Sequence, residues 1–216
     1  MSIVDAGGVT SAPQRTPQTE RTRAMRTRLM QATIDCLIER GWAGTTTTVV
    51  SQRAGVSRGA QLHHFPSKRE LVVASLEHLS EQLTMELQRR HDQATHGRRR
   101  STRSVLTMLA DYYTSDLFVA SLELWVAART DEPLHAVVLP MERRWGRNEH
   151  DLAVAMLGAD DTDPTTRALV QATLDMLRGF GLANTLSDDS RRRSRILAEW
   201  SKVFDTAARR TTGSPS

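Results

Sequence analysis

The stretch Thr46–Phe65, TTTVVSQRAGVSRGAQLHHF, contains two short segments with a helical pattern, joined by the tetrapeptide AGVS at 54–57. One of the threonines at 45–48 can cap the first helix, and the glycine of the tetrapeptide can end it because glycine adopts positive φ at little cost. The serine that follows can cap a second helix, which Phe65-Pro66 ends because the residue before a proline avoids the α region. This spacing predicts a helix-turn-helix in which Val56 fills the core between the two helices.

The second helix of this motif begins with residues that suit contacts with DNA bases. In a helix-turn-helix the N-terminal residues of this helix enter the major groove, and here they are Arg58, Gly59, Ala60 and Gln61. An arginine reads guanine through O6 and N7, and a glutamine can read adenine. Polar side chains around them would bind phosphates, and we expect this of Thr47, Ser57, His63, His64 and Lys68. The same turn also occurs in ordinary helical hairpins, so packing without DNA binding stays an alternative for the tetrapeptide taken alone.

Basic residues are concentrated around this motif. Between Arg15 and Arg69 the chain has ten basic and three acidic side chains, a net charge of +7, whereas residues 101–216 have 14 basic and 16 acidic ones. A basic segment attached to a nearly neutral remainder suggests a polyanionic partner for that segment. The alternative is a solvated basic surface, or a segment that binds an acidic protein.

Outside the motif, apolar residues recur at steps of three and four, which is the period of a helix with one buried face. Arg21–Arg40 shows this pattern, and Gly41 is placed to end it, with Trp42 packing back on the helix. No strand-like alternation occurs, so the sequence predicts an all-α fold of about nine helices. The further helices are expected after Ser67 to about Arg90, then at Val105–Tyr113, Leu117–Ala128, Asp131–Leu157 with a kink at Pro140, Thr165–Leu186 and Ser190–Ala208.

Composition excludes several classes of protein. Hydrophobic residues make up 39% of the chain and charged residues 25%, which is typical of a globular protein. The single cysteine, Cys36, excludes an internal disulfide framework and a cysteine-rich zinc site. No apolar run reaches the roughly 18 to 20 residues that span a bilayer, and the first 20 residues lack the apolar stretch of a secretory signal. We therefore expect a cytoplasmic protein that does not enter a membrane.

Motifs of catalysis are missing from the sequence. It has no nucleophile elbow, no phosphate-binding glycine loop and no His-Glu-x-x-His metal pattern. The adjacent residues His63 and His64 would point about 100° apart on a helix, which does not suit a shared metal ion. Cys36 falls on the expected buried face of the first helix, where a thiol is inert. We expect neither catalysis nor a metal ion nor a cofactor.

A longer pattern surrounds the turn, and it consists of Thr46-Thr47, Val50, Ala54-Gly55-Val56-Ser57-Arg58-Gly59, His64-Phe65-Pro66-Ser67-Lys68 and Glu70-Leu71. Together with Gly41-Trp42, this pattern over residues 21–79 resembles the N-terminal domain of TetR-type transcriptional regulators. The resemblance implies a three-helix DNA-binding domain with a helix-turn-helix, followed by a larger helical domain that binds ligands and dimerises. We expect a disordered arm at 1–20, the DNA-binding domain at 21–68, the effector-binding and dimerisation domain at 69–210 and a disordered tail at 211–216.

By this resemblance Arg58, Gly59 and Ala60 would read bases, together with Thr48 early in the first helix of the motif. The family usually has Leu-Tyr where this chain has Gln61-Leu62, and the family's tyrosine holds a phosphate. Leu62 cannot donate a hydrogen bond, which puts that phosphate contact in question. Gln61 is either a polar contact or a compromise in the core.

The resemblance also implies a homodimer on a palindromic operator of double-stranded DNA, which a small organic effector releases by shifting the population of conformations. Apolar and aromatic walls with one polar group, Glu123 or Arg129, suit such an effector, and the candidate wall residues are Leu109, Tyr113, Phe118, Leu122, Trp125, Met141, Trp145 and Met156. The last two helices would form the dimer interface through Leu174, Leu177, Phe180, Leu197, Trp200 and Phe204. Ordinary packing inside the chain is the alternative for each of these residues.

Two functions therefore stay open. One is a transcriptional repressor that a small organic molecule releases from DNA. The other is a DNA-binding regulator of the same fold without a small ligand, controlled by a protein partner or by its own abundance. The size of the pocket in the second domain is the feature that distinguishes them.

Overall fold

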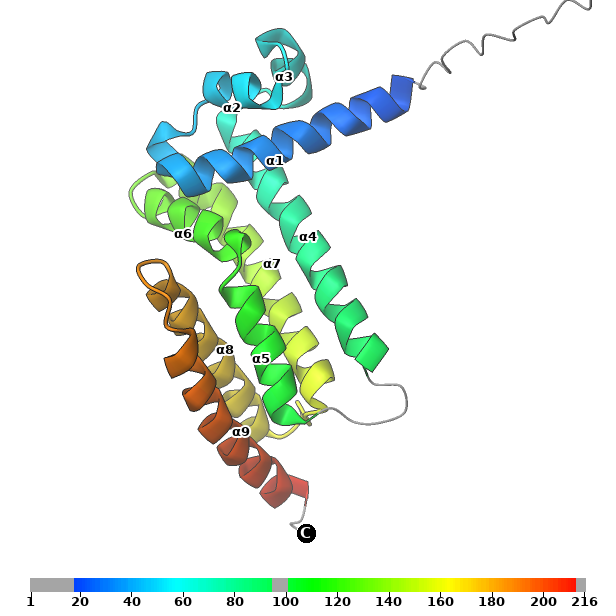
Figure 1. Cartoon of the computed structure of the whole chain (residues 1–216), viewed down its shortest axis with the longest axis vertical. Coiled ribbons are helices and arrows are strands. Elements are labelled where there is room, and N and C mark those ends of the chain that lie inside the picture. The colour runs from blue at the N-terminus through cyan, green and yellow to red at the C-terminus, as the bar shows by residue number, and fades with distance from the viewer. Residues whose placement is uncertain (1–17, 95–100, 213–216) are drawn as a thin grey trace, which may run out of the picture.

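The computed structural model describes residues 18–94 and 101–212, and helices make up nearly all of them (Figure 1). Neither range contains a strand, so the expected all-α fold of about nine helices is confirmed. No helix in these ranges combines the length and the apolarity that crossing a membrane requires. The helices are α1 (Gln18–Gly44), α2 (Thr47–Ala54), α3 (Arg58–His64), α4 (Lys68–Ala94), α5 (Thr102–Tyr113), α6 (Asp116–Ala128), α7 (Glu132–Leu157), α8 (Pro164–Asn184) and α9 (Ser190–Thr212).

Most helix boundaries lie close to the predicted ones, with differences at the two ends. Residues 18–20, expected in a disordered arm, form the first turn of α1, and residues 211–212, expected in a tail, belong to α9. Both extensions contain neither glycine nor proline, so nothing in them interrupts a helix. The rest of the expected arm and tail lies outside the described residues. The helix that contains Pro140 is continuous from Glu132 to Leu157, and the kink expected at this proline stays a prediction.

The first three helices form a small head around one cluster of apolar side chains. Leu29, Cys36, Val50 and Phe65 are at most 3% exposed and pack together with Leu71 from the start of α4. Burial raises the pKa of the Cys36 thiol, which keeps it protonated. The predicted buried position of this cysteine is therefore confirmed.

Gly41 interrupts α1 and turns the chain toward α2. Its φ of 65° and ψ of −176° are not helical, so the predicted end of the regular helix at this glycine is confirmed. A Cβ at this position would lie 2.7 Å from Oε2 of Glu123 on α6. Both the positive φ and the close approach of α6 therefore require a glycine here. Trp42, the next residue, packs against the apolar cluster that contains Leu37, as predicted.

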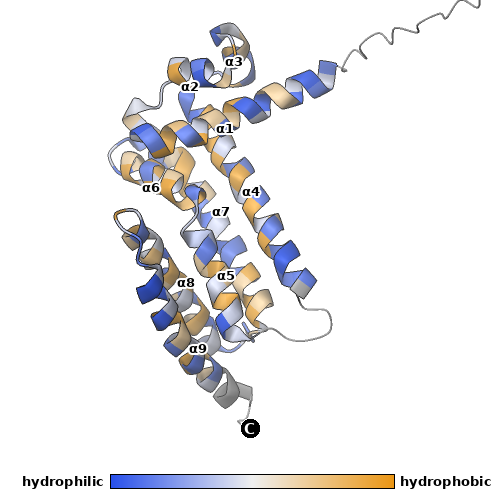
Figure 2. Cartoon of the chain, viewed as in Figure 1, coloured by the Kyte–Doolittle hydropathy of each residue, from blue (hydrophilic) through white to orange (hydrophobic). Residues whose placement is uncertain are grey.

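The body is built around α5, which contacts α4, α6, α7, α8 and α9. α4 runs from the head into the body as one helix, while α1 lies across the end of the body formed by α4 and α6 (Figure 1). One apolar cluster joins α5 to α8 and α9, and a second joins α4, α6 and α7 to the end of α1. Figure 2 shows apolar and polar residues alternating along α1 and α4, as expected of helices with one buried face.

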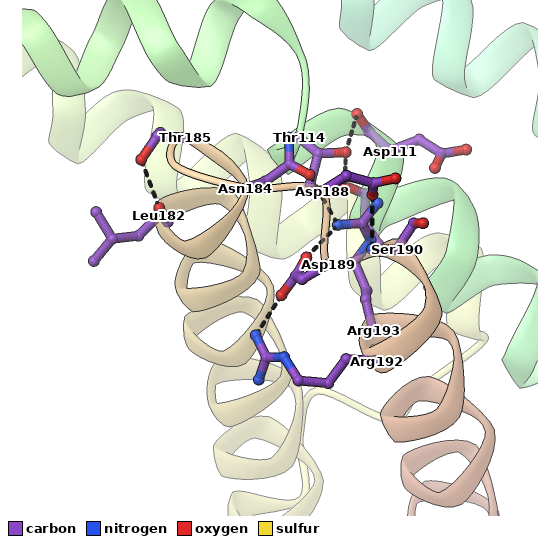
Figure 3. A network of polar contacts seen from close by, with 11 residues as sticks. Asp111, Thr114, Leu182, Asn184, Thr185, Asp188, Asp189, Ser190, Arg192 and Arg193 are labelled. Atoms are coloured by element: carbon purple, nitrogen blue, oxygen red, sulfur yellow. Dashed lines mark hydrogen bonds and ion pairs between the residues drawn. The ribbon is translucent and has the colours of Figure 1, made fainter.

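Polar contacts fix the turn between α8 and α9 (Figure 3). The Asp189 carboxylate pairs with Arg192 and Arg193, and Nη1 of Arg193 lies 2.9 Å from Oδ1. The same Nη1 donates to Oδ1 of Asn184, at the end of α8, over 3.3 Å. The side chains of Arg193 and Asp189 are only 13% and 11% exposed, so removing either one would leave a poorly solvated charge. These contacts hold α8 and α9 together as one hairpin on the side of the body (Figure 1).

Candidate nucleic-acid interface and internal cavity

The turn between α2 and α3 has the geometry that the sequence predicts. Gly55 ends α2 with φ 63° and ψ 38°, and the Val56 N–H donates to the Ser51 carbonyl over 3.0 Å. This is the usual way to end a helix at a left-handed glycine. Ser57 caps α3, because its Oγ accepts the Ala60 N–H at 3.2 Å. The Ser57 hydroxyl hydrogen stays free for another acceptor, such as a phosphate oxygen.

The outer face of α3 is defined here by Arg58, Gly59, Leu62 and His63, all of which are exposed. A Cβ built on Gly59 would meet nothing within 4 Å, so the surface next to it is open. Of the polar candidates on α2, Thr48 is exposed and Thr47 is half-buried. The geometry thus brings Arg58, Gly59, His63 and Thr48 to the surface of the head, where a second molecule can reach them.

Gln61 lies on the opposite side of α3, and the prediction that it contacts DNA is wrong. Its side chain is 0% exposed, and its Nε2 donates to the Phe65 carbonyl over 2.7 Å. Among the described residues its Oε1 has no hydrogen-bond partner. The helical period places this position toward the core, where the polar amide stands among apolar neighbours. The alternative interpretation, a compromise in the core, is the one that the structure supports.

Lys68 contacts the end of α1. Its Nζ donates to the Trp42 carbonyl over 2.5 Å and lies 3.8 Å from the centroid of the Trp42 ring. Burial lowers the pKa of Lys68, while the carbonyl and the ring favour its charged form. The phosphate contact expected of this ammonium group therefore competes with a contact inside the chain.

Arg26 on α1 contacts the end of α3, and the sequence did not indicate this contact. Its Nη1 donates to the His64 carbonyl over 3.3 Å, and its guanidinium lies 4.4 Å from the centroid of the Phe65 ring. Burial is the main cause that lowers the pKa of His64, and the nearby His63 and Arg26 lower it further. The neutral form is therefore favoured in the free protein, whereas a phosphate bound next to His64 would favour its charged form.

Part of the basic charge of the head is compensated within the chain. Arg53 on α2 lies 2.6 Å from Glu39 and 3.3 Å from Asp35, both on α1. The hydrogen bonds from Arg53 lower the pKa of the Glu39 carboxyl. Arg58 has no ion pair among the described residues. The charge that the head presents outward on α3 is therefore that of Arg58.

A small, partly open cavity of about 30 Å³ lies in the body, between α4, α5, α7 and α8, with room for about one or two water molecules. Three of the predicted wall residues, Leu109, Tyr113 and Trp145, line it. The lining also includes Leu87, Leu152 and Leu174, together with polar groups that the sequence did not single out, namely Ser80, Thr84, Tyr112, Asn148 and Glu149. They escaped prediction because helices far apart in the sequence bring them together.

Tyr113, Glu149 and Arg178 form a hydrogen-bonded network beside this cavity. The Tyr113 hydroxyl donates to Oε2 of Glu149 over 2.5 Å, and Nη2 of Arg178 donates to the same oxygen over 2.9 Å. Burial is the main cause that raises the pKa of Tyr113, and the Glu149 charge adds to it. The phenol therefore stays protonated and remains a hydrogen-bond donor. Glu149 is the one charged residue in the lining of the cavity.

The other predicted wall residues lie elsewhere. Glu123 accepts the Trp42 N–H at 3.2 Å, so the polar group expected in the pocket instead joins α6 to the end of α1. Arg129 is exposed at the end of α6, and Phe118 packs against Gly181, Tyr113 and Trp125. Packing inside the chain, the alternative interpretation, holds for Phe118, Leu122, Trp125, Met141 and Met156. Sequence spacing along one helix does not tell which of its sides faces the cavity.

The predicted dimer residues are mostly part of the core. Side chains at most 4% exposed cannot reach a partner subunit, and this applies to Leu174, Leu177, Phe180, Leu197 and Phe204. Trp200 is half-buried, and its Nε1 donates to Oγ1 of Thr173 over 2.9 Å. Apolar side chains nevertheless remain on the surface of the α8–α9 hairpin, and we refer to them as its outer face. Leu182 and Leu186 are exposed at and after the end of α8, and Ile196, Trp200 and Val203 line one depression on α9. Arg192, Arg195 and Glu199 border its α9 part.

Comparisons with known proteins agree with this architecture. The model of the family described as "Bacterial regulatory proteins, tetR family" matches residues 29–74. An uncharacterized HTH-type transcriptional regulator of Mycobacterium bovis is 34% identical over 167 residues, which cover 74% of this chain and 84% of that protein. The HTH-type transcriptional regulator CymR of Pseudomonas putida is 39% identical over 123 residues, which cover 57% of this chain and 60% of CymR.

Two solved structures have a similar fold. A transcriptional regulator from Rhodococcus sp. Rha1 matches with a TM-score of 0.66 at 22% identity, over 85% of this chain and 97% of that chain. The multidrug binding protein EbrR, solved in complex with ethidium, matches with a TM-score of 0.57 at 23% identity, over 82% of this chain and 97% of that chain.

Replacing Gln61 with leucine tests whether this residue belongs to the core or to the interface. Gln61→Leu removes the unpaired Oε1, but it also takes away the donor of the Phe65 carbonyl, so one unpaired buried acceptor replaces another. We expect the free energy of unfolding to change by less than about 1 kcal/mol and the DNA affinity to stay within two-fold of the original. Denaturant unfolding and fluorescence anisotropy measure the two quantities. A selective loss of DNA binding in a well-folded variant would show that Gln61 contributes to the DNA interface after all.

Proposed function

Because the chain belongs to the TetR family of bacterial regulatory proteins, which are DNA-binding transcriptional regulators rather than enzymes, we propose that it is a repressor that binds a palindromic operator as a homodimer and is released by a small organic effector. In this proposal 21–68 is the DNA-binding domain and 69–210 the effector-binding and dimerisation domain. The single observation that carries it is the outer face of α3. Arg58 extends there from the start of the second helix of a helix-turn-helix and has no ion pair among the described residues.

The proposed contacts with DNA fall into two groups. Arg58 reads a guanine, and Gly59, Ala60 and Thr48 lie against neighbouring bases in the major groove. Phosphate contacts, which fix the position of the protein on the duplex, come from Thr47, Ser57, His63, His64 and Lys68. Lys68 has to keep or exchange its contact with Trp42 when it binds a phosphate.

Selection from a random pool of DNA duplexes at fixed, near-physiological salt tests the DNA-binding part of the proposal. We expect a two-fold symmetric site to be enriched. Arg58→Ala should then cost about 1 to 3 kcal/mol and relax the preference at one base position in each half-site. Arg103→Ala, an exposed arginine at the far end of the body, removes the same charge and should leave the preference unchanged. An Arg58→Ala variant that keeps both affinity and preference would show that another surface reads the DNA.

The proposed dimer interface is the outer face of the α8–α9 hairpin. Val203 is 51% exposed and Leu182 56%, and apolar surface of this kind on a folded monomer usually marks an interaction site. Exposed Ala172 and Gly179 on α8 leave room for a partner helix to approach closely. A four-helix contact between two copies would bury these residues, while Leu174, Leu177, Phe180, Leu197 and Phe204 support it from inside each chain.

A charged residue in this face should separate the subunits. Val203→Glu places a carboxylate in the proposed interface without touching the core, so we expect monomers in analytical ultracentrifugation at micromolar concentration and loss of binding to the palindromic site. Val126→Glu introduces the same charge at a position of similar exposure, 59%, on α6 and should leave the dimer intact. Dimers of Val203→Glu with unchanged stability would place the interface elsewhere.

The proposed effector site is the cavity between α4, α5, α7 and α8. Its apolar walls and its few polar groups suit an organic molecule with an apolar body and one hydrogen-bonding group. At about 30 Å³ the cavity has to widen, by separation of the helices around it, before such a molecule fits. Tyr113 and Glu149 are placed to orient that group. EbrR, which has the same fold, is a multidrug binding protein that was solved with ethidium. Occupation of the cavity would favour a conformation in which α4, which carries Ser80 and Thr84, holds the head differently.

A thermal-shift screen of small aromatic amines, acids and alcohols tests this site. A true ligand at 100 times its Kd stabilises the native state by about 2.7 kcal/mol, which is a shift of at least about 5 °C for a chain of this size. The same compound should weaken binding to the selected operator. Ser80→Leu fills part of the cavity and should abolish both effects, whereas Thr107→Leu on the exposed side of α5 should not. If no compound stabilises the protein, or if stabilisation does not release DNA, small molecules in this cavity do not control DNA binding, and control by a protein partner or by abundance is favoured.

A further inference from the structure

Leu62 is the one large apolar side chain on the outer face of α3. It is 41% exposed, although its neighbour Gln61 is completely buried. The helical repeat explains why one of these neighbours is exposed and the other buried, because successive side chains on a helix point about 100° apart. Leu62 therefore lies outside the core of the head, whereas Gln61, the polar residue before it, is part of that core.

Leu62 shares its side of the helix with Arg58. Residues four apart are neighbours on a helix surface, and both side chains are exposed. Gly59 lies beside this pair, and a Cβ there would meet nothing within 4 Å. Arg58 is exposed and Leu62 keeps 41% of its surface exposed, so a base pair can approach both side chains.

The chemistry of DNA narrows what an exposed leucine can contact. Phosphates and sugar oxygens need hydrogen-bond donors or cations, which leucine lacks. On the major-groove edges of the bases the 5-methyl group of thymine is the large apolar group, beside the much smaller C5–H of cytosine, and apolar side chains contact that methyl group.

We propose that Leu62 contacts a thymine methyl group and so selects a T·A pair in each half-site. This inference rests on the proposed docking of α3 in the major groove. Arg58 and Leu62 are about 6 Å apart along the helix axis, and bases stack about 3.4 Å apart. The selected thymine therefore lies within about two base pairs of the guanine that Arg58 reads.

Replacement of thymine by deoxyuridine tests the contact, because it removes the methyl group and keeps every hydrogen-bonding group. Each thymine of the selected operator is replaced in turn, symmetrically in both half-sites. Loss of one buried methyl contact corresponds to about a four-fold weaker affinity per half-site. We expect the unmodified protein to lose about ten-fold or more at a single symmetric position and little at the others.

Variants assign the effect to Leu62. Leu62→Ala should bind the thymine operator about ten-fold more weakly and should not distinguish thymine from deoxyuridine at that position. This comparison cancels any change in DNA shape that the deoxyuridine causes, because both proteins meet the same duplexes. His63→Ala, with a change on the same outer face, should keep the full sensitivity to deoxyuridine. Thermal unfolding of each variant confirms that it is folded, which the exposure of both side chains leads us to expect.

The outcomes separate this inference from the proposed function. A symmetric operator without any position sensitive to deoxyuridine overturns the inference and leaves the proposed function standing. The inference is also overturned if Leu62→Ala loses as much affinity as the unmodified protein when the same thymine is replaced by deoxyuridine. Failure to enrich any operator overturns the proposed function, and the contact of Leu62 falls with it.

Discussion

The backbone of Trp42 is the point on which the orientation of the head depends. Its N–H donates to Glu123 on α6, and its carbonyl accepts Nζ of Lys68 at the start of α4. The same ammonium group lies over the indole ring. Gly41, immediately before, has the positive φ and the bare Cα that let α6 come close. Three helices that are far apart in the sequence are thus held at one turn of the chain.

This arrangement explains how the body can act on the head. α4 contributes Ser80 and Thr84 to the wall of the cavity and Lys68 to the contact with Trp42. α6 contributes Glu123 at one side of the same turn. In the effector control proposed above, a change in the packing of α4 or α6 would reach the head directly, because the head contacts both helices. Coupling between two sites requires an element of this kind, whose position both sites can bias.

The second helix of the helix-turn-helix shows a different compromise. It places a polar glutamine in the core and an apolar leucine on the surface, the reverse of what burial alone favours. The glutamine satisfies its amide N–H with the Phe65 carbonyl but leaves its oxygen unpaired among the described residues. Such a helix has given up some stability of the head, since an unpaired buried acceptor costs free energy. Departures of this kind from the usual pattern tend to mark functional surfaces.

The sequence by itself determined the helices, their caps and the turn of the helix-turn-helix. Gly41, Gly55 and Ser57 act over one to four residues, and local hydrogen bonding and backbone preference govern such short distances. Only the tertiary structure decided which side of each long helix faces the core, the cavity or the solvent. Leu174, expected at a dimer interface, lines the cavity instead. Glu123, expected in a pocket, accepts a hydrogen bond from the Trp42 N–H. The physical reason is that an apolar stripe shows that a helix face is buried, whereas the packing of helices distant in sequence decides what it is buried against.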